Sequence, residues 1–287
     1  MTRLRLAIST CPNDTFAFHG LLMGRVDRRG LDFDVELLDI AQLNSGLMEG
    51  RFDVAKASFH AALHLAESML VLPSGSALGF GVGPLLLAAR ESDPDRWPTD
   101  GPPARALCPG QWTTATLLLK LFHAPALAEK RVEIEHVVFS DIMPRLKEGS
   151  ADFGVCIHEG RFTWRDQGLF LVEDLGQRWE TATDCPLPLG GILASRALPA
   201  ETLSAVQQVI SDSITYGLAN RQETAETMRR YAQEFDDDVL FQHVDLYVND
   251  WTRDLGEVGR SSLAALSQRA QQAGLLPPDA PPLEVWG

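Results

Sequence analysis

The sequence holds few cysteines and no long apolar run. Its four cysteines are far apart and form no C-x-x-C pair, which argues against a zinc knuckle or a dithiol redox motif. Free thiols in a reducing compartment fit this pattern best. No apolar stretch approaches the roughly 20 residues that a membrane span needs, and residues 1–8 are too short for the core of a secretion signal. We therefore expect a cytoplasmic protein that does not enter a membrane.

Positive charge is also scarce. The 287 residues contain 25 Lys and Arg against 39 Asp and Glu, for a net charge of -14, so the phosphate backbone of a nucleic acid would be repelled. We expect no nucleic-acid partner. The hydrophobic and charged fractions, 45% and 22%, are those of a globular protein long enough for one large domain or two lobes.

Strand and helix patterns alternate along most of the chain. Asp39 is the expected N-cap of a helix over 40–49, with Gly50 as its stop, and the pattern from Pro199 onward is helical. Such alternation predicts an α/β fold in which helices cover parallel sheets. Strands are predicted at 4–8, 33–38, 53–57, 69–72, 84–89, 104–107, 152–157 and 187–194.

Landmarks in the first part of the chain recur about 100 residues later. Cys108-Pro109 echoes Cys11-Pro12, and Asp141-Ile142 echoes Asp39-Ile40, which suggests two lobes built on one plan. We expect a two-lobed, periplasmic-binding-protein-like (type 2) α/β fold. Ligands of such sheets bind at the carboxyl ends of strands, in the cleft between the lobes. The predicted first lobe comprises residues 1–88 and 192–287, and the second lobe residues 89–191.

Two polar turns fall where this cleft is expected. Ser9 to Thr15, which includes Asn13 and Asp14, precedes one predicted helix, and Thr113-Thr114 precedes another. The unpaired N–H groups at a helix start attract anions, so two facing turns favour a site for a carboxylate. Plain N-capping explains either turn taken alone.

His158 follows a predicted apolar strand, and Lys56 interrupts another. A histidine at the carboxyl end of a buried strand can act as a general base; alternatively, it holds a loop in place. Lys56, with Ala57 and Ser58, either lies beside the ligand or extends its ammonium to the rim. The remaining histidines fall mostly within helix or strand patterns and are expected to be structural: His19, His60, His64, His123, His136 and His243.

The glycine-rich segment 75–83 does not fit a nucleotide site. It lacks the Gly-Lys-Ser/Thr ending of a P-loop and the G-x-G-x-x-G spacing, and a strand is predicted after it. A flexible approach to a hinge is the better interpretation. Because the chain has neither a G-x-S-x-G elbow nor an H-E-x-x-H metal motif, hydrolase and metalloenzyme functions have little support.

Motifs spread over nearly the whole chain are, taken together, typical of one enzyme family. They are S-T-C-P-N-D-T-F at 9–16, K-A-S at 56–58, G-F-G-V-G-P at 79–84, T-T-A at 113–115, I-H-E-G-R-F-T at 157–163, L-P-L-G at 187–190 and Y-V-N at 247–249. On these motifs the chain resembles the 1,4-dihydroxy-6-naphthoate synthases of the futalosine route to menaquinone. It departs from them at Thr10, where proline is usual, and at Gly160, where serine is common.

The resemblance implies a carbon–carbon lyase that needs no cofactor and no metal. Its reaction converts cyclic dehypoxanthinyl futalosine to 1,4-dihydroxy-6-naphthoate and dihydroxyacetone. In that family the histidine that matches His158 is the proposed base. The segments that match Lys56 to Ser58 and Thr113-Thr114 line the pocket for this small carboxylate substrate. We add Asn13 and Asp14 of the first polar turn to the candidate binding residues.

Two other functions remain as alternatives. A solute-binding or sensor module uses the same two-lobed architecture without turnover, but neither an export signal nor an appended helix-turn-helix region is evident. Chorismate dehydratase, of the same pathway, has a similar architecture, but its expected motif differs from the C-P-N-D-T turn found here. The sequence does not predict the oligomeric state.

Overall fold

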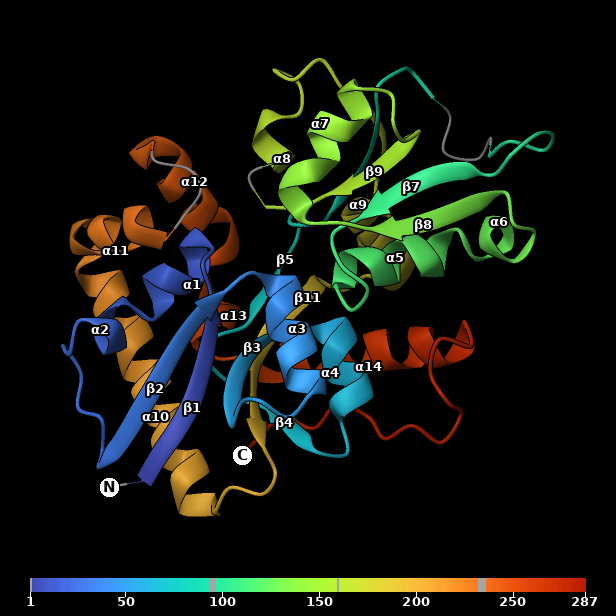
Figure 1. Cartoon of the computed structure of the whole chain (residues 1–287). Coiled ribbons are helices and arrows are strands. Elements are labelled where there is room, and N and C mark those ends of the chain that lie inside the picture. Colours follow the sequence, from blue (N-terminus) through green and yellow to red (C-terminus); the bar gives the residue numbers. More distant parts are fainter. Residues whose placement is uncertain (1, 93–96, 159, 232–235) are drawn as a thin grey trace.

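Two mixed sheets, one in each lobe, organise the chain (Figure 1). The structure, a computed structural model, describes residues 2–92, 97–158, 160–231 and 236–287. The first sheet has the order β2-β1-β3-β11-β4, with β5 also paired to β11: β1 Thr2–Ser9, β2 Leu31–Leu38, β3 Val54–Ser58, β4 Met69–Val71, β5 Ala77–Gly79 and β11 Leu187–Ser195. The second has the order β10-β6-β9-β7-β8: β6 Leu85–Ala88, β7 Ala104–Cys108, β8 Val132–His136, β9 Phe153–Cys156 and β10 Phe170–Asp174.

Fourteen α-helices are seen in the described part of the chain, with 3₁₀ turns at Phe139–Asp141 and Arg221–Glu223. They are α1 Pro12–Ala17, α2 His19–Leu22, α3 Ile40–Met48, α4 Phe59–Leu65, α5 Thr114–Phe122, α6 Ala124–Ala128, α7 Ile142–Lys147, α8 Gly160–Thr163, α9 Leu175–Thr183, α10 Ala200–Ala219, α11 Thr224–Tyr231, α12 Asp237–Tyr247, α13 Asp250–Arg253 and α14 Gly256–Gln272.

The start of α3 shows how local sequence places a helix. Asp39 has an extended backbone, and its carboxylate accepts hydrogen bonds from the amides of Ala41 and Gln42. The Gln42 side chain in turn accepts from the Asp39 amide, which completes a capping box. Gly50, with a φ of +70°, follows the end of the helix. The predicted cap and stop are both confirmed.

The two lobes repeat one plan, as the sequence landmarks suggested. In the first lobe β1 pairs in parallel with β2 and β3, and β11 is antiparallel to β3. In the second, β7 pairs in parallel with β8 and β9, and β6 is antiparallel to β9. The expectation of purely parallel sheets was therefore wrong, because the strands next to the crossovers run against their neighbours.

The strand pairing places both crossovers between the lobes a few residues earlier in the chain than predicted. β6 belongs to the second sheet and the whole of β11 to the first, so the chain crosses between residues 79 and 85 and returns between 183 and 187. Boundaries at 88 and 191 would cut these strands from their sheets. We propose lobe limits near 84 and 187 in their place.

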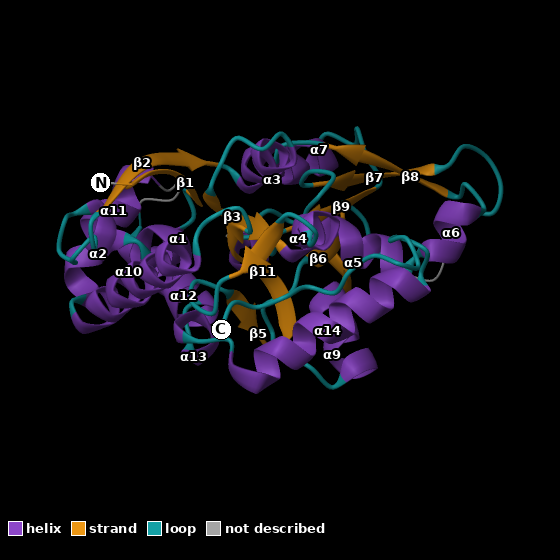
Figure 2. Ribbon diagram, turned by 90° about the horizontal axis from the view of Figure 1, so that it is seen from below, coloured by secondary structure: helices purple, strands orange, loops and turns teal. Residues whose placement is uncertain are grey.

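The C-terminal helices return to the first lobe, and the last helix reaches the second as well. α10 packs on α2, and α11 and α12 pack on α1, whereas α14 contacts both β11 and α5 (Figure 2). The largest apolar cluster runs through both lobes, from Leu43 and Phe59 to Leu118 and Val155, with Leu263 of α14 among its members. The lobes thus share one core in this state.

Hydrogen bonds at the start of α5 join the lobes directly. The Thr114 hydroxyl donates to the Leu189 carbonyl of β11, with 2.6 Å between the oxygens. His60, at the start of α4, has its Nδ1 3.1 Å from the Thr113 carbonyl. Because a carbonyl only accepts, Nδ1 is the protonated nitrogen of this ring. No described helix combines the length and the apolar character that crossing a membrane requires.

The His60 contact predicts a pH-dependent stability. Burial, together with the nearby Lys120, lowers the pKa of His60 to about 3, so below pH 6.5 only the unfolded state takes up this proton. The contribution of His60 to the free energy of unfolding is fully present above pH 6.5 and falls as the pH decreases toward 3. One such group changes the free energy of unfolding by about 1.4 kcal/mol per pH unit.

His60→Asn removes the titrating group and keeps a donor for the Thr113 carbonyl. Urea unfolding gives the decrease in unfolding free energy from pH 7 to pH 5. This decrease should be about 2 kcal/mol smaller in the variant than in the unmodified protein. Equal losses in the two proteins would contradict this assignment.

Candidate active site

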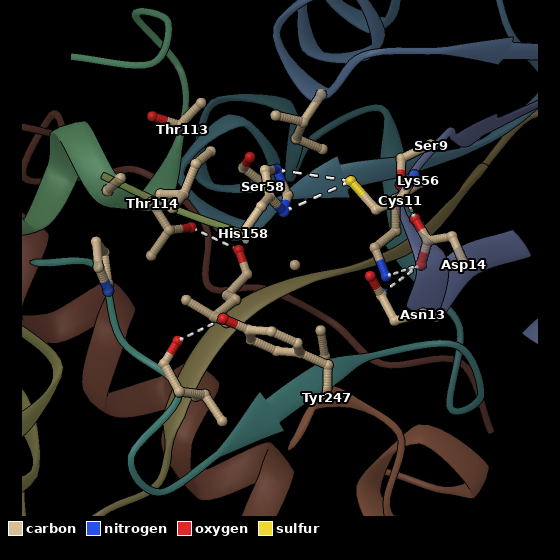
Figure 3. A pocket seen from close by; sticks show the side chains of 18 of the residues that line it. Ser9, Cys11, Asn13, Asp14, Lys56, Ser58, Thr113, Thr114, His158 and Tyr247 are labelled. Atoms are coloured by element: carbon tan, nitrogen blue, oxygen red, sulfur yellow. Dashed lines mark hydrogen bonds and ion pairs between the residues drawn. The ribbon is translucent and has the colours of Figure 1, made fainter. Parts of the chain in front are cut away.

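A cavity of about 90 Å³ lies between the lobes, at the carboxyl ends of β1, β3 and β9 (Figure 3). Its walls come from segments far apart in the sequence. The first lobe contributes Ser9, Cys11, Asn13, Asp14, Lys56, Ser58, Leu189, His243 and Tyr247. The second contributes Thr113, Thr114, Ala115, Ile157 and His158.

A buried ion pair forms the floor of the first-lobe side. The Lys56 ammonium lies 2.8 Å from Oδ1 of Asp14, with 6% and 3% of the two side chains exposed. The ammonium also donates to the Gly75 carbonyl at 3.0 Å, and the Ser9 hydroxyl donates to Asp14 Oδ2 at 2.6 Å. Lys56 therefore does not extend to the rim: its charge is neutralised inside the protein.

Asn13 and His243 extend this network along the cavity wall. The Asn13 amide donates from Nδ2 to Asp14 Oδ1 at 2.9 Å. Nε2 of His243 lies 3.0 Å from Oδ1 of Asn13, although 230 residues separate the two in sequence. The His243 ring also packs against Tyr247, one helical turn farther along α12, with 4.5 Å between ring centroids.

His158 faces this network from the second lobe. It follows β9 in the left-handed backbone region, with a φ of +54°, which is uncommon for a residue other than glycine. Sγ of Cys11 lies 3.5 Å from Nδ1 and 3.6 Å from Nε2 of the imidazole. The ring packs edge-on against Phe139, with centroids 5.0 Å apart, and lies 6.1 Å from the His243 centroid. Glu159, the next residue, lies outside the described residues.

The start of α5 supplies hydrogen-bond donors on the second-lobe side. The Thr113 hydroxyl caps the helix by accepting from the Thr116 amide, and the Thr114 hydroxyl donates to Leu189. Both hydroxyls are therefore engaged within the protein. The amides of Thr114 and Ala115 belong to the first turn, which has no intrahelical acceptors for them, and both residues line the cavity. These amides can bind an anion.

Six of the seven predicted binding residues and His158 line this one cavity: Asn13, Asp14, Lys56, Ser58, Thr113 and Thr114. The exception is Ala57, which is fully buried in the apolar core. Successive side chains of a strand point to opposite faces, so Ala57 points away from the face that carries Lys56 and Ser58. Its side chain therefore does not line the cavity, and its role as a binding residue stays a prediction.

Several cavity residues were not among the predicted site residues, and three of them take part in the contacts above. Cys11 was noted as a free thiol and as part of the first polar turn, His243 was taken as structural, and Tyr247 was noted only as part of a family motif. His243 and Tyr247 are four positions apart on one helix, a spacing that places them on the same face. The described residues contain no group of three His, Cys, Asp or Glu side chains that could hold a metal ion.

Comparison with known proteins identifies relatives over nearly the full length. Residues 4–272 match a family described as menaquinone biosynthesis. A protein from Thermus thermophilus named 1,4-dihydroxy-6-naphtoate synthase is 40% identical over 99% of this chain and 100% of its own. A protein of the same name from Streptomyces coelicolor is 38% identical over 96% of this chain and 97% of its own.

Solved structures show the same architecture. A protein from Archaeoglobus fulgidus superimposes with a TM-score of 0.86 at 30% identity, covering 96% of this chain and 98% of that one. The ligand-binding component of an ABC-type import system from Staphylococcus aureus gives a TM-score of 0.70 at 12% identity, over 99% of this chain and 94% of its own. The predicted periplasmic-binding-protein-like fold is therefore confirmed.

The buried ion pair leads to a prediction about stability. Lys56→Met leaves the Asp14 carboxylate buried without its cation and should cost about 3–5 kcal/mol of unfolding free energy, measured by urea denaturation. The double variant Lys56→Met/Asp14→Asn buries no unpaired charge and should lose less than the sum of the two single variants. Arg3→Met, which breaks an exposed ion pair with Asp34, should leave the free energy nearly unchanged. If the double variant loses as much unfolding free energy as the two single variants together, Lys56 and Asp14 do not stabilise each other.

Proposed function

The chain belongs to the menaquinone biosynthesis family, and we propose that it converts cyclic dehypoxanthinyl futalosine to 1,4-dihydroxy-6-naphthoate and dihydroxyacetone. One observation carries the proposal: the His158 imidazole and the first turn of α5 line the same cavity between the lobes. The names of the relatives from Thermus thermophilus and Streptomyces coelicolor support the choice of product.

His158 acts as the general base in this proposal. Its imidazole lines the cavity, so it can reach a carbon-bound proton of a substrate held in the cleft. Removal of that proton leaves an electron pair that forms a double bond in the ring while the carbon–carbon bond to the three-carbon fragment breaks. The electrons of the broken bond leave with the fragment, which then takes up a proton. Formation of the aromatic naphthalene ring favours cleavage, and dihydroxyacetone is the second product. The proposed reaction proceeds without a metal or an organic cofactor.

The substrate carboxylate binds at the start of α5. The first-lobe side of the cavity already contains the Asp14 carboxylate, whose charge is balanced by Lys56, so a second anion gains nothing there. At α5 the amides of Thr114 and Ala115 point out of the helix start, where the helix dipole also favours negative charge. Binding here leaves the ring system of the substrate between this helix and His158.

The general base has a direct test. His158→Ala and His158→Asn should each lower kcat by about 10²- to 10⁴-fold, the usual contribution of a general base. Asparagine tolerates the left-handed backbone of this position, so His158→Asn keeps the fold while its amide takes up no proton. Products are measured by anaerobic mass spectrometry, with chorismate as a parallel substrate. Retention of more than about a tenth of kcat in either variant would exclude His158 as the base.

The carboxylate site is tested by two substitutions at one position. Thr114→Val removes the hydroxyl that joins the lobes, and Thr114→Pro removes both the hydroxyl and the amide N–H. Proline suits the first helical position, and Thr113 before it is extended (φ -77°, ψ 148°). A hydrogen bond to a charged group is worth about 1.5–3 kcal/mol, so kcat/KM should fall about tenfold or more from the valine to the proline variant. Equal values would place the carboxylate elsewhere.

A further inference from the structure

His243 holds a buried nitrogen without a partner in the wall of the cavity. The residue is 1% exposed and lines the cavity from α12. Nε2 is bonded to Asn13, but Nδ1 has no hydrogen-bond partner among the described residues. A buried polar atom without a hydrogen-bond partner destabilises the protein, and a ligand atom that forms the missing hydrogen bond removes this cost.

The surrounding network fixes which nitrogen carries the proton. Asp14 is a carboxylate held by Lys56, so the neighbouring Asn13 presents its N–H to Asp14 and its carbonyl oxygen to His243. That oxygen only accepts, and Nε2 of His243 must therefore donate. In the neutral ring Nδ1 is then a bare acceptor.

His243 stays neutral in this position. Complete burial lowers the pKa of His243 well below its usual value, and positive charge on His158 lowers it further. A second proton would have to bind at Nδ1 itself. The nitrogen therefore remains an acceptor and selects a donor, which excludes a carboxylate or a carbonyl oxygen as its partner.

We propose that Nδ1 of His243 accepts a hydrogen bond from a hydroxyl group of the substrate, and that Asn13 is the positioning residue for this contact. The inference rests on the proposed function, whose substrate gives two products that both carry hydroxyls. The hydroxyl belongs either to the part that becomes the naphthoate ring or to the part that becomes dihydroxyacetone. His243 is then a specificity-determining residue of the cavity.

Two buried histidines give a matched pair of variants. In His243→Gln the longer amide reaches the place of Nε2 and keeps the bond to Asn13, but nothing replaces Nδ1. His19 is also buried, with an unpartnered Nε2 and with Nδ1 2.8 Å from the Thr227 hydroxyl, but it does not line the cavity. His19→Asn removes that Nε2 and keeps a polar atom near Thr227.

Steady-state kinetics then separates the roles of the two positions. His243→Gln should raise KM about 3- to 10-fold, the effect of one neutral hydrogen bond, while kcat changes less. His19→Asn should leave both constants unchanged. An unchanged KM in His243→Gln, in a preparation where the unmodified protein turns over the substrate, overturns this inference and leaves the proposed function intact.

Binding measurements identify the hydroxyl. The affinities of 1,4-dihydroxy-6-naphthoate and of 2-naphthoate, which lacks both hydroxyls, are compared by anaerobic calorimetry. If the ring hydroxyl is bound, the preference for the dihydroxy compound shrinks about 3- to 10-fold in His243→Gln. If the three-carbon fragment is bound, that preference is unchanged, and inhibition by dihydroxyacetone weakens by a similar factor. A variant that changes neither quantity overturns the inference.

Nitrogen NMR on the unmodified protein provides a test that does not depend on how a variant folds. With ¹⁵N-labelled histidine, the His243 signals should report a proton on Nε2 and a bare Nδ1 in the free protein. Product binding should shift the Nδ1 signal toward that of a hydrogen-bonded nitrogen. A proton on Nδ1 in the free protein overturns the inference. Protein that neither turns over the substrate nor binds either naphthoate overturns the proposed function, and this inference with it.

Discussion

The buried ion pair between Lys56 and Asp14 sets the polarity of the whole first-lobe side of the cavity. Removing an ammonium and a carboxylate from water is expensive unless they pair and their remaining positions are satisfied. Ser9, Asn13 and the Gly75 carbonyl satisfy them here. Because Asp14 accepts only, Asn13 has one allowed orientation, and that orientation determines the proton position on His243. A single charge pair thus orders a chain of neutral groups.

The same pair bears on where this acidic protein would bind the proposed substrate carboxylate. With a net charge of -14, the chain offers no general attraction to a carboxylate. Lys56 is the only lysine among the described residues that line the cavity, and its charge is already neutralised. Local dipoles have to provide the site, and the start of α5 supplies them from the opposite lobe. Since the proposed base and the proposed carboxylate site lie on the second lobe and the polar network on the first, the proposed site is complete only when the lobes meet. The bond from Thr114 to Leu189 is one of the contacts made there.

Sequence patterns predicted the features that depend on residues close together in the chain. The cap at Asp39, the apolar strands β1, β3 and β9, and the turns that follow them all depend on neighbouring residues, and so does the position of His158. The short strands β5, β8 and β10 were missed: β5 and β8 have only three and five residues, and β10 joins three apolar residues to two acidic ones, so none gives a long periodic pattern. Strand direction escaped prediction too, since pairing between β3 and β11 is decided by contacts across more than a hundred residues. His243 needed the fold itself, because its partner Asn13 is 230 positions away.

The two facing histidines differ in what their surroundings allow. The rings lie 6.1 Å apart at an interplanar angle of 28°, close enough that a positive charge on one disfavours a charge on the other. His243 is completely buried and already donates from Nε2, so a further proton would cost it desolvation and repulsion together. His158 lies beside the Cys11 thiol and packs edge-on against the Phe139 ring. In the proposed reaction the proton taken from the substrate is held on His158, while His243 keeps its Nδ1 lone pair for the proposed hydroxyl contact. The burial that keeps His243 neutral thus supports the proposal that His158, and not His243, is the base.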